Sequence, residues 1–101
     1  LYGVLLNDDG GIIDDLIVYR RAQDYRLVLN AGTRQAVLDW LAKQNREQID
    51  LAERELAMVA VQGPRAVECF VSLNAAPVAE DAFTFVEQAD WLVARTGYTG
   101  E

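Results

Sequence analysis

LYGVLLNDDGGIIDDLIVYR, residues 1–20, is the stretch that decides the fold. Its two apolar runs, 1–7 and 12–20, are rich in the aliphatic, β-branched and aromatic residues that favour strands. Between them, Asp8-Asp9-Gly10-Gly11 is a strong turn signal, because Asp and Gly both suit tight turns. The stretch therefore predicts a β-hairpin, against which the rest of the chain must pack.

After residue 20 the sequence moves between strand-like and helix-like patterns. Thr33 suits a helix N-cap, and Val37, Leu38 and Leu41 follow it at helical spacing. Pro64 suits the first position of a second helix. The further elements that we expect are strands at 25–30, 56–62, 82–88 and 91–96, a helix at 34–45 and a helix from Gly63-Pro64 onward. This mixture predicts an α+β fold, a largely antiparallel sheet with two helices on one face.

The composition is globular and acidic. Sixteen acidic and nine basic residues give a net charge of -7. This charge opposes binding to a phosphate backbone, so we expect no nucleic-acid partner. No apolar run has the length of a membrane span, so we also expect no membrane partner. Cys69 is the single cysteine, which fits a reducing compartment.

The length of 101 residues suits one domain, 1–101. Leu1 already lies in an apolar run, and Glu101 directly follows a Gly-Tyr-Thr-Gly turn. We therefore expect this domain to be a fragment of a longer protein.

The most unusual feature of the sequence is Asp14-Asp15 inside an apolar strand, where Asp is normally depleted. Strand alternation puts Asp15 on the same face as Ile17 and Tyr19, and Asp14 on the opposite face. A carboxylate, an aliphatic side chain and a phenol in a row suit a flat, polar aromatic ligand. The alternative is structural: one aspartate caps the turn and the other faces water.

Other residues that could carry chemistry are few. The chain has no histidine, so acid–base chemistry would fall to carboxylates, tyrosines or lysines. Asn7, Asp9 and Gly11 imitate the spacing of a calcium loop, but the loop's final Glu is missing and the flanks predict strands. We therefore expect no metal site.

Three segments, in this order, resemble the glycine cleavage T-protein family of aminomethyltransferases. They are residues 10–19, GGIIDDLIVY, residues 60–64, AVQGP, and residues 95–101, RTGYTGE. Residues 25–31, YRLVLNA, are also similar to this family, so the resemblance covers nearly the whole chain. It implies that residues 1–101 are part of the family's folate-binding domain and incomplete as an enzyme on their own.

The resemblance also implies an activity, in glycine catabolism and one-carbon metabolism. The family takes the aminomethyl group carried on the lipoyl arm of its partner, the H-protein. Tetrahydrofolate accepts the one-carbon unit, and ammonia is released. The expected location is the cytoplasm in a bacterium and the mitochondrial matrix in a eukaryote.

The family's site residues can be carried over at matching positions. Its catalytic aspartate is the second of the Asp-Asp pair and matches Asp15. Its folate contacts match Asp15, Ile17 and Tyr19 on one strand, Tyr2 on the preceding strand and Tyr98 in the Gly-Tyr-Thr-Gly turn. Amine attack on an activated methylene needs proton transfer and stabilisation of positive charge, which a carboxylate supplies.

Two alternatives stay open at this point. One is a folate-dependent domain attached to a sarcosine or dimethylglycine dehydrogenase, which an upstream flavin-binding domain would indicate. The other is a non-catalytic folate-binding relative, against which the presence of Asp15 argues.

Overall fold

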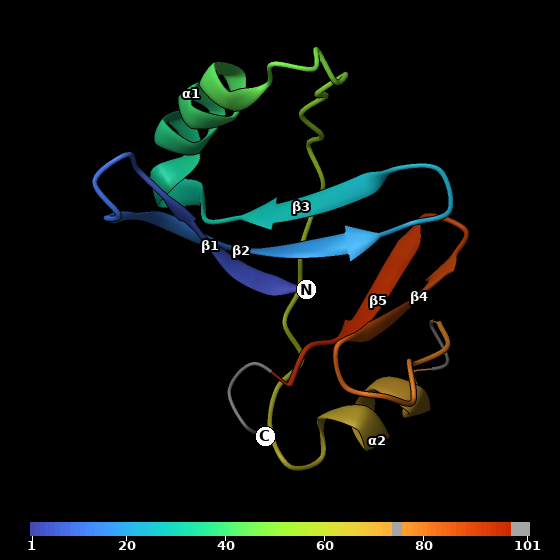
Figure 1. Cartoon of the computed structure of the whole chain (residues 1–101). Coiled ribbons are helices and arrows are strands. Elements are labelled where there is room, and N and C mark those ends of the chain that lie inside the picture. Colours follow the sequence, from blue (N-terminus) through green and yellow to red (C-terminus); the bar gives the residue numbers. More distant parts are fainter. Residues whose placement is uncertain (74–75, 98–101) are drawn as a thin grey trace. The chain divides into compact units, whose positions relative to one another are not determined.

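The computed structural model describes residues 1–73 and 76–97 and divides the chain into two compact units, Leu1–Arg54 and Glu55–Glu101 (Figure 1). In chain order the elements are β1 (Tyr2–Leu6), β2 (Ile12–Arg20), β3 (Tyr25–Leu29), the 3₁₀ turn η1 (Ala31–Thr33), α1 (Arg34–Gln44), α2 (Ala66–Ser72), β4 (Thr84–Gln88) and β5 (Trp91–Arg95). The predicted α+β class with antiparallel strands is confirmed. Among these described elements, neither helix has the length and apolar character of a membrane span.

The strands form two sheets, where the sequence suggested one. The first unit contains the three-stranded sheet β1-β2-β3 together with α1, and the second contains the hairpin β4-β5 together with α2. Each unit is therefore a small α+β structure in which antiparallel strands pair with their neighbours in the sequence.

The hairpin predicted from residues 1–20 is confirmed. β1 pairs antiparallel with β2, with Tyr2 opposite Ile17. In the turn, Oδ1 of Asn7 accepts the backbone N–H of Asp9 at 3.1 Å and of Gly11 at 2.7 Å. Gly10 has φ of 83°, a conformation that glycine adopts without the penalty a Cβ brings. The turn residues thus set the register that brings β1 beside the aspartate pair.

Helix α1 holds the turn end of this hairpin. The indole Nε1 of Trp40 donates to the carbonyl of Leu6 at 3.0 Å, and Nζ of Lys43 lies 2.7 Å from Oδ2 of Asp8. Val37 has no exposed surface and is the most buried side chain of the helix. The apolar positions that predicted the helix therefore also supply its packing.

The second unit differs from expectation in two places. Residues 56–62, expected as a buried strand, are exposed and belong to neither sheet. An apolar run favours a strand, but a strand also needs a hydrogen-bonded neighbour, and neither described sheet offers one to this run. Helix α2 begins at Ala66, so Pro64 lies in the preceding turn instead of at the first helical position.

The hairpin at the end of the described chain agrees with the predicted strands. Gln88 pairs with Trp91, so Ala89 and Asp90 alone make the connection. Ala89 adopts φ of 51° there, a left-handed conformation that the tight turn requires.

Candidate functional site

Asp15 lies on β2, the central strand of the first sheet, and is partly buried. Its Oδ2 accepts a hydrogen bond from the Tyr2 hydroxyl at 2.7 Å. Its Oδ1 accepts one from Nδ2 of Asn30 at 2.6 Å. Because one donor comes from each neighbouring strand or its end, both carboxylate oxygens are fixed. A carboxylate has about four lone-pair sites, so such a group can accept several donors at once.

Asp14 points to the other face of β2 and has different surroundings. It is buried, with 6% of its surface exposed. Its Oδ1 accepts Nδ2 of Asn30 at 2.7 Å, and its Oδ2 accepts the Thr33 hydroxyl at 2.7 Å and the Asn30 backbone N–H at 3.3 Å. The Asn30 side chain first, and Thr33 second, hold the pKa of the Asp14 carboxyl below its usual value, against the opposing effect of burial. The charged Asp14 side chain therefore connects β2 to the start of α1 through hydrogen bonds.

Asn30 connects the two aspartates, and sequence reasoning missed it. Its side-chain nitrogen donates to Oδ1 of Asp14 and to Oδ1 of Asp15. An amide nitrogen carries two hydrogens, so one can serve each carboxylate. Asn30 follows Leu29, which lies opposite Leu16, so Asn30 continues the register to a place beside Asp15. The signal in the sequence was a polar residue at the end of an apolar strand, which does not reveal a partner 15 residues earlier.

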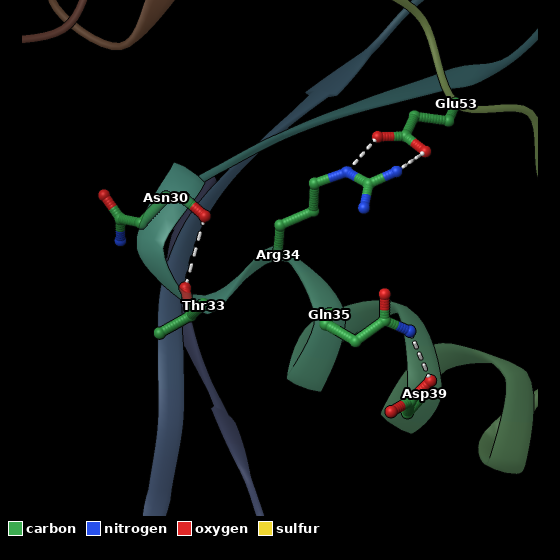
Figure 2. A network of polar contacts seen from close by, with 6 residues as sticks. All are labelled: Asn30, Thr33, Arg34, Gln35, Asp39 and Glu53. Carbon is green, nitrogen blue, oxygen red and sulfur yellow. Dashed lines mark hydrogen bonds and ion pairs between the residues drawn. The ribbon is translucent and has the colours of Figure 1, made fainter.

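Figure 2 shows the start of α1 next to Asn30, where the Thr33 hydroxyl lies 3.2 Å from the Asn30 carbonyl. Thr33 occupies the predicted cap position, but its side chain makes no capping hydrogen bond to the helix and bonds to Asp14 instead. The next residue, Arg34, makes two 2.6 Å contacts with the carboxylate of Glu53. That pair is exposed, so it contributes little to stability compared with the buried Asp14 cluster.

The remaining residues of the expected ligand wall lie along the same face as Asp15. Ile17 is partly buried and sits directly opposite Tyr2. Tyr19, two residues further, is only 8% exposed, so a ligand could reach a small part of its ring. Burial raises the pKa of the Tyr19 phenol, which therefore stays protonated at neutral pH. The sheet thus brings Tyr2, Asp15 and Ile17 together, with Tyr19 further along the strand.

The comparisons with known proteins bear directly on this site. Residues 1–101 match the GCVT N-terminal domain family. The chain belongs to this family. Similar relatives are the aminomethyltransferases of Alcanivorax borkumensis, 49% identical over 100% of this chain, and of Legionella pneumophila strain Corby, 50% identical over 100%. That of Francisella philomiragia is 42% identical over 99%.

This GCVT N-terminal domain spans about 30% of the length of each of these relatives. No solved structure matches it. Four of its expected site residues, Tyr2, Asp15, Ile17 and Tyr19, lie in the first unit. The fifth, Tyr98, lies outside the described residues. In the ranges 1–73 and 76–97, no three Cys, Asp or Glu side chains are grouped to hold a metal ion.

Proposed function

We propose that this chain is the folate-binding part of an aminomethyltransferase of the glycine cleavage system. In this proposal the aminomethyl group comes from the lipoyl arm of the H-protein. The one-carbon unit passes to tetrahydrofolate, and ammonia leaves. Membership of the GCVT N-terminal domain family and the aminomethyltransferase relatives support this reaction class.

The observation that carries the proposal is the difference in surroundings between the two neighbouring aspartates. Asp14 is buried, and its oxygens accept three hydrogen bonds at the helix start. Asp15 is less buried, shares the Asn30 amide with Asp14, and also accepts the Tyr2 hydroxyl from β1. An oriented carboxylate suits a group that takes a proton or stabilises positive charge.

We assign the roles on this face accordingly. Asp15 accepts a proton from the reacting folate amine and stabilises the positive charge that develops there. Ile17 offers an apolar surface to the pterin, with the Tyr2 ring beside it on β1. Tyr19 and Tyr98 complete the proposed folate contacts.

The test compares Asp15→Asn with its matched neighbour Asp14→Asn in a full-length protein that contains this chain. Single-turnover transfer from loaded H-protein to tetrahydrofolate should fall by roughly a hundredfold or more for Asp15→Asn, because the charge is lost while the shape is kept. Tetrahydrofolate affinity and thermal stability of this variant should change much less.

Asp14→Asn should show the reverse pattern, with lower thermal stability and transfer close to normal in the folded fraction. The assignment is wrong if Asp15→Asn transfers normally while Asp14→Asn does not. If both variants simply unfold, the aspartate pair is structural and the proposed mechanism fails.

A further inference from the structure

The Tyr2 hydroxyl on β1 donates a hydrogen bond to the Asp15 carboxylate on β2. Tyr2 is 43% exposed, so part of this residue is accessible to solvent. Its direct neighbour across the strands is Ile17, and Asp15 is the diagonal neighbour two residues earlier on β2. Diagonal neighbours are within reach of aromatic side chains, and the hydroxyl oxygen lies 2.7 Å from Oδ2 of Asp15.

Tyr2 and Asn30 donate to different oxygens of Asp15. Tyr2, which lies on β1, donates to Oδ2 of Asp15, and Asn30, which follows β3, donates to Oδ1. Two contacts at opposite corners of a planar group stop it from rotating, whereas one contact would leave it free to turn. Hydrogen bonds to the ionised form also favour that form over the neutral acid.

We propose that Tyr2 is a positioning residue, whose hydroxyl fixes the orientation of the Asp15 carboxylate for proton transfer. The inference rests on the proposed function, in which Asp15 is the catalytic residue. A folate contact alone would need only the ring of Tyr2. The proposed positioning role depends on its hydroxyl as well.

The first sheet carries other ionisable groups, one beside Asp15 and others further along its strands. Tyr19 lies on the same face of β2, and Arg26 lies opposite Tyr19 on β3. Asp14 faces the other way but shares the Asn30 amide with Asp15. None of these groups is altered when Tyr2 loses only its hydroxyl, so a change in the pH profile can be traced to the Tyr2 contact.

The experiment uses Tyr2→Phe in a full-length protein that contains this chain, with Tyr25→Phe as control. Tyr25 is 65% exposed at the start of β3, opposite Arg20 and away from Asp15. For Tyr2→Phe, single-turnover transfer should fall about tenfold, the scale of one lost hydrogen bond to a charged group, with KM for tetrahydrofolate nearly unchanged. The acid limb of the kcat/KM profile should move to higher pH by about half a unit to one unit. Tyr25→Phe should change neither.

A double variant separates positioning from direct contact. Adding Tyr2→Phe to Asp15→Asn should cause no further loss of transfer, because Tyr2 acts through the carboxylate that is already gone. Equal losses in both backgrounds would overturn the proposal, as would an unshifted pH profile or a Tyr2→Phe protein that does not fold. Normal transfer by Asp15→Asn alone would instead show that the proposed function has failed.

Discussion

At the scale of single residues, one step along a strand separates two carboxylates into different environments. Asp14 is enclosed by donors from Asn30 and Thr33, whereas Asp15 is oriented by Tyr2 and Asn30 on the opposite face. The shared amide of Asn30 also reduces the repulsion between the two negative charges, because its hydrogens point at both. Asn30 therefore supports the helix start and the proposed site together.

Replacing Asn30 should accordingly damage stability and activity together. Asn30→Leu has a similar volume but offers neither carboxylate a side-chain donor, so the unfolding midpoint should fall by several degrees. Transfer by the folded protein should fall about tenfold, since Asp15 loses one of the contacts that orient it. Thermal unfolding and single-turnover transfer measure the two effects.

The matched control is Gln35→Leu, which removes an exposed amide that donates to Asp39 within α1. It should leave both measurements close to normal. An Asn30→Leu protein with an unchanged unfolding midpoint would show that the amide does not hold the aspartates.

At the scale of elements, the contact between β2 and the start of α1 depends on a charge. Hydrogen bonds from Asn30 and Thr33 lower the pKa of Asp14 from its ordinary value of 3.8. A lowered pKa in the folded state means that the stabilisation is present above that ordinary value. It is lost as the pH falls further and the carboxylate is protonated.

The unfolding midpoint should therefore depend on pH in a way that Asp14→Asn removes. Between about pH 6 and about pH 3, the wild-type midpoint should fall more than that of Asp14→Asn. Other carboxylates with lowered pKa values, such as Asp8 and Glu53, are present in both proteins and cancel in the comparison. The exposed Asp50, changed to Asn, is the control and should keep the wild-type dependence. Parallel curves for wild type and Asp14→Asn would contradict the assigned role.

Sequence reasoning predicted elements well where the signal was local. The turn at 8–11, the strand at 12–20 and the helix beginning at Arg34 depend on neighbouring residues, and the structure confirms them. It was wrong for 56–62, because a strand needs a partner that an apolar run does not specify.

Only part of the candidate site could be predicted from the sequence, because the sequence shows local patterns and not the pairing of strands. Alternation predicted opposite faces for Asp14 and Asp15, which both lie on β2, and the resemblance supplied Tyr2. Neither revealed that Asn30 bridges the pair, because that contact depends on the register between β2 and β3. Such long-range hydrogen bonds appear only once the strands are paired.

At the scale of the whole molecule, the described residues include a long stretch without regular structure. Residues 46–62 are exposed throughout and belong to no helix or strand, and the boundary between the two units falls within them. Exposed backbone outside sheets and helices is the preferred substrate of proteases.

Limited digestion of this chain should therefore begin in that stretch. Thermolysin, which cuts beside apolar residues, should act first near Leu51, Leu56 or Met58, which are 52%, 58% and 78% exposed. Mass spectrometry of early products should show intact fragments corresponding to the two units. First cuts inside β2 would show that the first sheet opens more readily than the connecting stretch.

The alternation of side chains between the two faces of β2 determines what an inherited deletion of one residue from this strand would do. Loss of one codon between Leu16 and Val18 would move the preceding residues by one position relative to β3, so each would change face. Asp14 would then take the place of Asp15 beside Asn30, and Ile13 would take the place of Asp14 near Thr33. A carboxylate would remain at the proposed catalytic position while the helix start lost its acceptor. Such an in-frame deletion would therefore act first on protein abundance, and only secondarily on catalysis.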